Sequence, residues 1–242
     1  MIYELMNKIP RDSSFLSSED VLTGTIFGYL RYFHNQSILI KFLNESTDIF
    51  GNNLKINLDV IFKLYFWKKF YQSKNKNKFN EPDILLCDDY YDIIIECKYY
   101  SQLGENNSEN IENGENYNNQ LLRYSKIIEK SNKMKIIIFL TNDAIMPTEI
   151  MKKTLSKLDS KIKLFWLSWK SLYRVLKYSK SDCINIGEKM LRKDILAFLK
   201  KREITLFCGF ARININIEWK YNKIYTYGIK YYYQTWEYKS EK

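Results

Sequence analysis

Asp83, Glu96 and Lys98 lie in the stretch from Asn80 to Lys98, which also has a strand-forming pattern. Apolar runs at 84–87 and 93–95 flank a polar break, and this pattern predicts a β-hairpin with a two-residue turn at Asp89-Tyr90. The position of the turn sets the register of the two strands and thereby the partners of the charged residues.

In that register Asp83 lies directly opposite Glu96. Side chains alternate along a strand, so Glu96 and Lys98 project to one face. Two carboxylates opposed across strands repel each other unless a cation lies between them. Mg²⁺ suits this position because it takes oxygen ligands, and a neighbouring lysine can orient a metal-bound water. The predicted chemistry is metal-assisted hydrolysis of a phosphodiester. An edge hairpin in which Glu96 and Lys98 form an ordinary ion pair remains the alternative.

The order Pro82-Asp83 followed by Glu96-Cys97-Lys98 resembles the PD-(D/E)xK phosphodiesterase superfamily, which has the restriction-endonuclease-like fold. The resemblance implies that Asp83 and Glu96 hold one or two Mg²⁺ ions, for which Mn²⁺ would substitute. It also implies the backbone carbonyl of Cys97 as a third metal ligand. Lys98 would orient the attacking water and offset charge in the transition state.

A first helix is predicted to open at Ser17-Ser18-Glu19-Asp20, with serine as the N-cap and acids in the first turn. Glu19 favours the helix dipole, which is one explanation of its position. The superfamily resemblance offers another, because a glutamate on the first helix of several branches reaches the metal site. Glu19 is therefore a candidate catalytic residue and a possible metal ligand.

A later helix, from Asn119, places Gln120 and Tyr124 on one face. The pair resembles the Gln-xxx-Tyr element that follows the catalytic strand in many nuclease branches. By this resemblance Gln120 helps to position the substrate or the metal-bound water. Tyr124 is expected to pack behind the site and to be part of the nucleic-acid-binding surface.

The segment before the hairpin is basic, and we expect it to be a loop that meets a phosphate backbone; a merely solvated loop is the alternative. The net charge of the whole chain is +10, which favours a polyanionic partner, although part of the lysine content matches the codon bias of an AT-rich genome. The candidate nucleic-acid-binding lysines are Lys68, Lys69, Lys74, Lys76 and Lys78.

The remaining pattern predicts an α/β protein with a mixed central sheet flanked by helices. The resemblance implies that this sheet and its helices form a restriction-endonuclease-like core. We expect a core at 1–180 that includes a mobile insertion at 101–119, and a C-terminal helix plus aromatic β-rich extension at 181–242 that packs on the core. The expected elements are strands at 56–66, 135–140 and 162–166, helices at 148–158, 168–177 and 188–200, and strand-like segments at 204–210 and 213–233.

Several classes of protein are disfavoured. The chain contains a single histidine, which argues against zinc sites and Ser-His chemistry, and it has no Gly-rich phosphate loop. No signal pattern or span of about 20 apolar residues occurs, so a cytoplasmic protein without a membrane segment is expected.

The sequence therefore predicts a metal-dependent nuclease that hydrolyses DNA, in bacterial defence or a mobile element. The alternatives are a catalytically silent nucleic-acid or protein adaptor of the same fold, and an RNA nuclease. A homodimer, or a partner protein from a defence operon, is the expected assembly.

Overall fold

The computed structural model describes residues 18–72, 75–99, 113–179, 183–206, 217–226 and 229–238. Within these ranges only the backbone is described for residues 72–78, 113–119 and 217–238. The chain divides into two compact units, Met1–Leu206 and Phe207–Lys242. The candidate site residues Asp83, Glu96 and Lys98 lie in the first unit.

A mixed five-stranded sheet forms the centre of the first unit, with the strand order β1-β4-β5-β6-β7. The antiparallel strands are β1 (Lys63–Phe66), β4 (Ile84–Cys87) and β5 (Tyr91–Lys98). The strands β6 (Met134–Thr141) and β7 (Ile162–Ser168) continue the sheet parallel to β5. The predicted hairpin and its register are confirmed, because Ile84 pairs with Ile95 and Cys87 pairs with Asp92.

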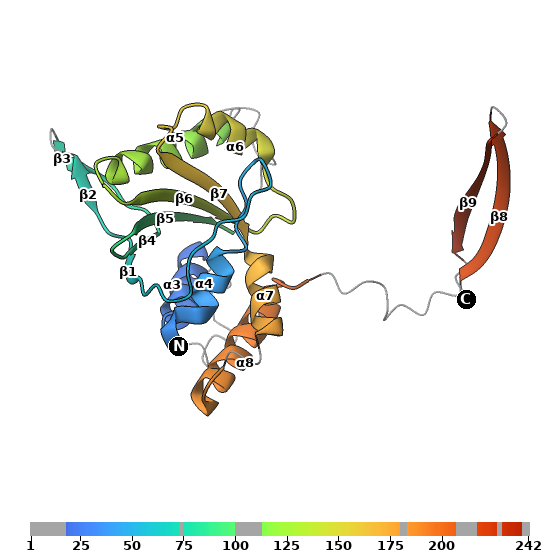
Figure 1. Cartoon of the computed structure of the whole chain (residues 1–242), viewed down its shortest axis with the longest axis horizontal. Helices are drawn as coiled ribbons and strands as arrows, with labels where there is room; N and C mark the ends of the chain where they lie inside the picture. The colour runs from blue at the N-terminus through green and yellow to red at the C-terminus, as the bar shows by residue number, and fades with distance from the viewer. Residues whose placement is uncertain are drawn as a thin grey trace. The chain divides into compact units, whose positions relative to one another are not determined.

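Helices cover both faces of this sheet, as Figure 1 shows. One face packs against α3 (Glu19–Leu30), α4 (Ser37–Leu43) and α7 (Trp169–Tyr178), and the short 3₁₀ helix η1 (His34–Gln36) joins α3 to α4. The other face packs against α5 (Asn113–Ile128) and α6 (Thr148–Leu155). The α/β class and the mixed sheet with flanking helices are therefore confirmed.

Strand β5 divides its side chains between the two layers. Ile93, Ile95 and Cys97 lie in the core shared with α3, α4 and α7, whereas Ile94 lies in the core shared with α5 and α6. By the same alternation, Glu96 and Lys98 leave the strand on the α5 side. The strand is buried on both faces over its centre, so its polar residues are confined to its ends.

The predicted strand at 56–66 is wrong in length, because only Lys63–Phe66 pairs in the sheet. In the preceding segment side-chain amides satisfy the backbone instead of a neighbouring strand. Asn44 accepts from the Ile56 N–H at 2.7 Å and donates to its carbonyl at 3.0 Å. Gln36 does the same for Phe62, with both distances 2.9 Å. These bonds give the segment its backbone partners without a ladder.

The basic segment is also not the loop that we expected. It forms a small antiparallel hairpin from β2 (Phe70–Gln72) and β3 (Asn75–Asn80). The insertion expected at 101–119 is shortened, since α5 already begins at Asn113, and the remainder lies outside the described residues.

The helix α8 (Ile186–Lys201) belongs to the first unit, because Ile195, Phe198 and Leu199 are buried in the core of α3 and α7. The two compact units divide after Leu206, and α8, the C-terminal helix that we expected to pack on the core, lies in the first of them. The second unit contains one antiparallel hairpin, β8 (Ile217–Thr226) and β9 (Ile229–Tyr238). Its packing on the core stays a prediction. Within the described residues, no helix combines the length and apolarity needed to cross a membrane.

Candidate metal and phosphodiesterase site

Four charged residues from three parts of the first unit meet at the end of β5. Glu19 begins α3, Asp83 immediately precedes β4, and Glu96 and Lys98 end β5. Ser18 caps α3, with its side chain accepting from the Val21 N–H at 3.4 Å, so the helix starts where Glu19 can reach the strand end.

Lys98 holds the cluster together. Its Nζ lies 2.8 Å from Oε1 of Glu96 and donates to Oε1 of Glu19 at 3.1 Å. Burial alone would lower the pKa of Lys98, but the carboxylates of Glu96, Glu19 and Asp83 raise it above its ordinary value. Lys98 is therefore a fixed ammonium group, which suits stabilisation of negative charge and orientation of a water rather than proton abstraction.

Glu96 is the most buried charge of the cluster, with 1% of its surface exposed. Burial, and secondly the nearby Asp83 carboxylate, raise the pKa of Glu96 to about 8. Its Oε1 faces Lys98, whereas its Oε2 has no hydrogen-bond partner among the described residues. An orphaned, buried carboxylate oxygen is expensive to maintain. A cation beside it would remove that penalty.

Asp83 lies beside Glu96 by continuation of the hairpin register. Its Oδ2 accepts from the Cys97 N–H at 2.7 Å, which fixes the carboxylate against β5. Burial raises the pKa of Asp83 to about 6 despite this bond and the nearby Lys98. Two neighbouring carboxylates with raised pKa values are a typical signature of a site that binds a cation or transfers protons.

The cluster fits a hard divalent cation through Asp83 and Glu96, with backbone or water oxygens completing the shell. No group of three or more His, Cys, Asp or Glu side chains spaced for a metal occurs among the residues that the structure describes. Glu19 is engaged elsewhere, because its Oε2 accepts from the Tyr99 N–H at 2.8 Å while its Oε1 accepts from Lys98. This geometry supports Glu19 as a residue that positions Lys98; its metal ligation, like that by the Cys97 carbonyl, stays a prediction.

Gln120 and Tyr124 meet as predicted on α5. The Gln120 Nε2 donates to the Tyr124 hydroxyl at 2.8 Å, and this hydroxyl donates to the Glu81 carbonyl at 3.1 Å. Tyr124 is only 3% exposed, which matches the expected packing behind the site and leaves little of the side chain for the expected nucleic-acid-binding surface. Tyr124 instead ties α5 to the segment that carries Asp83.

We expect Tyr124→Phe to lower the free energy of unfolding by about 1 kcal/mol, because the half-buried Gln120 amide and Glu81 carbonyl lose their shared partner. Urea unfolding followed by circular dichroism measures this loss. Tyr32→Phe is the matched control, since the Tyr32 side chain is exposed, and its stability should change by less than about 0.5 kcal/mol. Equal stabilities of the two variants would contradict a structural role for the Tyr124 hydroxyl.

The predicted basic residues are placed only in part. Lys68 and Lys69 are exposed and precede β2, and the Lys69 Nζ lies 3.7 Å from Oε2 of Glu81. Lys74 lies outside the described residues, and of Lys76 and Lys78 the structure describes only their place in β3.

Sequence reasoning missed the residues that anchor α3 to the end of β5. The Tyr99 hydroxyl donates to the Arg202 carbonyl at 2.5 Å, and the Arg202 guanidinium donates to the Ser18 carbonyl at 2.9 Å. The end of α8 thereby supports the start of α3. A tyrosine after the Glu-x-Lys motif and an arginine at a helix end carry no signal that would have linked them.

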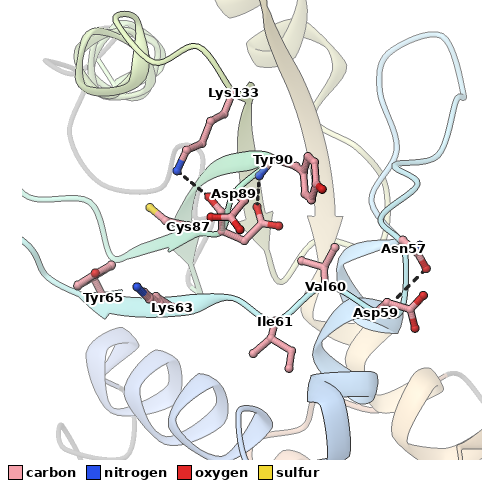
Figure 2. A pocket seen from close by; sticks show the side chains of 11 residues that line it. Asn57, Asp59, Val60, Ile61, Lys63, Tyr65, Cys87, Asp89, Tyr90 and Lys133 are labelled. Atoms are coloured by element: carbon pink, nitrogen blue, oxygen red, sulfur yellow. Dashed lines mark hydrogen bonds between the residues drawn. The ribbon is translucent and has the colours of Figure 1, made fainter.

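A hollow lies at the opposite end of β4 and β5 from the carboxylates, around the turn between these strands (Figure 2). Lys133 reaches into it and donates to the Asp88 carbonyl at 2.6 Å. Asp83, Glu96 and Lys98 are not among its lining residues. Asp88 and Lys133 bond the backbone of the turn, so the candidate site is the charged cluster at the end of β5.

A scan against protein-family models found no match to the chain, and searches of curated proteins and of solved structures found none either. The case for a function is therefore made from the site itself.

Proposed function

We propose that this protein is a restriction-endonuclease-like, Mg²⁺-dependent nuclease that hydrolyses phosphodiester bonds of DNA, in bacterial defence or in a mobile element. The observation that carries the proposal is the buried Glu96, whose Oε2 lacks a partner among the described residues and which lies between Asp83 and the fixed ammonium of Lys98. A buried carboxylate oxygen without a hydrogen-bond partner costs stability, and such groups concentrate at sites where a bound ligand offsets that cost.

In this proposal Asp83 and Glu96 hold the cation, with the Cys97 carbonyl as a further oxygen ligand. Bound Mg²⁺ supplies a Lewis acid for the phosphoryl oxygens and lowers the pKa of a coordinated water. Lys98 orients that water and stabilises the negative charge that develops on the phosphate. Glu19 keeps the Lys98 ammonium in place through the 3.1 Å hydrogen bond. Gln120 orients the water or substrate from the α5 side.

The test is incubation of the protein with supercoiled plasmid in Mg²⁺, in Mn²⁺ and in EDTA. We expect nicked or linear DNA with either metal and intact plasmid in EDTA. Single-stranded DNA and RNA of the same sequence are tested in parallel. Cleavage of RNA alone would show that the protein is a metal-dependent ribonuclease and not a deoxyribonuclease. Absence of metal-dependent cleavage of all three substrates would count against a stand-alone nuclease.

One observation favours a second candidate, a catalytically silent adaptor of the same fold. Lys98 already neutralises Glu96 directly, at 2.8 Å. An adaptor needs no metal at the hairpin, whereas the nuclease does. Calorimetric titration with Mg²⁺ separates the two, because the nuclease proposal expects saturable binding that Asp83→Asn abolishes.

A further inference from the structure

The β2–β3 hairpin carries an exposed pair of aromatic rings. Tyr71 and Phe79 are directly opposite in the strand register, with ring centroids 5.8 Å apart and ring planes inclined by 60°. Tyr71 is 63% exposed and Phe79 is 43% exposed. The two rings touch each other but leave much of their surface open to solvent.

The same hairpin is strongly basic. The segment from Lys68 to Asn80 contains five lysines and no acidic residue. The described lysines lie against aromatic rings, with the Lys69 Nζ 4.6 Å from the centroid of the Phe79 ring and the Lys68 Nζ 4.4 Å from that of Tyr65. Open rings beside lysines are the combination that proteins use to bind single strands, through base stacking and backbone charge.

The base of the hairpin adjoins the carboxylates. Trp67 lies just before β2, and its backbone N–H donates to the Asp83 carbonyl at 3.1 Å. Trp67 has a positive φ of 46° and its ring lies against α3, where a Cβ on Gly24 would come within 2.9 Å of it. Phe79 is four residues before Asp83 in the chain, a reach of at most about 14 Å. That distance corresponds to about four stacked nucleotides of one strand.

A purely structural role for the Tyr71–Phe79 pair explains the contact between the rings but not the lysines beside them. A two-stranded hairpin is marginal, and a cross-strand aromatic pair supports it. The five lysines of this segment act against that support, because like charges on a small hairpin repel each other. A duplex would need the lysines for its phosphates but not the open rings, since its bases are already stacked. An unpaired strand uses both features.

We propose that the β2–β3 hairpin binds unpaired bases of single-stranded DNA by stacking them on Tyr71 and Phe79, and so delivers a single strand to the carboxylate site. The delivery step rests on the proposed nuclease function. The stacking step concerns the hairpin alone. The hairpin is labelled β2 and β3 in Figure 1, where it extends from the sheet beside β1.

The first test measures binding in EDTA, where cleavage cannot occur. Fluorescence anisotropy compares oligo-dT of about 20 nucleotides with a duplex of the same length. The double variant Tyr71→Leu/Phe79→Leu, which keeps apolar side chains, is expected to bind oligo-dT at least about tenfold more weakly and the duplex within about twofold of wild type. Its salt dependence should be unchanged. Equal affinities of wild type and variant for oligo-dT would overturn the proposal.

Two controls separate stacking from charge. Tyr90→Leu removes an aromatic side chain that is 72% exposed in the β4–β5 turn, away from the carboxylates, and should leave oligo-dT affinity unchanged. Lys68→Ala/Lys69→Ala should flatten the plot of log affinity against log salt, by roughly 0.7 for each lost phosphate contact. A Tyr90→Leu loss equal to that of the double variant would show that the effect is not specific to the hairpin, and would overturn the proposal.

The second test uses wild-type protein, so a folding defect cannot confuse it. Oligo-dT substituted with 5-bromouracil is irradiated in the complex, and the cross-linked residue is identified by mass spectrometry. Cross-links at Tyr71 or Phe79 support the proposal, and cross-links confined to other residues overturn it. Stacking without cleavage of any substrate would contradict the nuclease proposal but not the stacking. Cleavage of single-stranded DNA at the same rate by wild type and by the double variant would contradict only the stacking. Binding of oligo-rU without oligo-dT would reassign the strand to RNA.

Discussion

Lys98→Ala is expected to lower the rate of plasmid cleavage in Mg²⁺ by about 10²- to 10³-fold while leaving the fold intact. The reason is that Lys98 is the cation that contacts both Glu96 and Glu19, at 2.8 and 3.1 Å, and is held as an ammonium by its neighbours. A preorganised positive group at the reacting phosphate contributes an effect of this size. Initial rates of nicking under saturating plasmid measure it.

Lys133→Ala is the matched control. Lys133 is also half-buried, lies 3.8 Å from Asp92 and donates to the Asp88 carbonyl, but at the opposite end of the same hairpin. Its variant should cleave plasmid within about twofold of wild type. Circular dichroism and thermal melting confirm that both variants are folded. A folded Lys98→Ala protein that cleaves at the rate of Lys133→Ala would refute the assigned role.

Glu96→Gln is expected to abolish cleavage and to stabilise the metal-free protein. The amide keeps the shape of the side chain but removes an acidic group that is only 1% exposed beside Asp83, and that the folded protein must keep protonated at a pH where the unfolded chain releases the proton. We expect a gain of about 1 kcal/mol at pH 7.5, seen as a rise of about 2–4 °C in melting temperature in EDTA. Mg²⁺ should raise the melting temperature of wild type but not that of the variant.

The effect of Glu96→Gln has a defined pH dependence. Burial raises the pKa of Glu96 from 4.5 to about 8 in the folded protein. Between these values the folded state holds a proton that the unfolded chain has released, so the contribution of Glu96 to stability falls as the pH rises. The advantage of the variant should therefore be absent below about pH 4.5, grow up to about pH 8 and then level off.

Asp92→Asn serves as the control, because Asp92 is on the same strand and paired with Lys133 instead of Lys98. It should show neither the gain in EDTA nor the loss of the Mg²⁺ response. Two results together would contradict a cation at Glu96: a wild-type melting temperature that does not respond to Mg²⁺, and a Glu96→Gln melting temperature equal to that of wild type.

Local patterns determined much of what the sequence revealed. The β4–β5 register followed from a polar two-residue turn between apolar runs, because the period of a strand leaves one arrangement that buries both faces. The serine that caps α3 and the face shared by Gln120 and Tyr124 were readable for the same reason. Each of these features depends on residues only a few positions apart.

The tertiary structure decided the features that depend on distant segments. Asn44 and Gln36 hold the segment before β1 in place of a strand, and nothing in an alternating apolar pattern signals that substitution. The contact of Glu19 with Lys98 spans 79 positions and exists because α3 packs on the sheet beneath the end of β5. The burial that leaves the Glu96 carboxylate short of partners likewise arises only when both helical layers close over the sheet. Charge spacing could therefore be predicted from the sequence, whereas the desolvation that raises the pKa values of Asp83 and Glu96 required the assembled core.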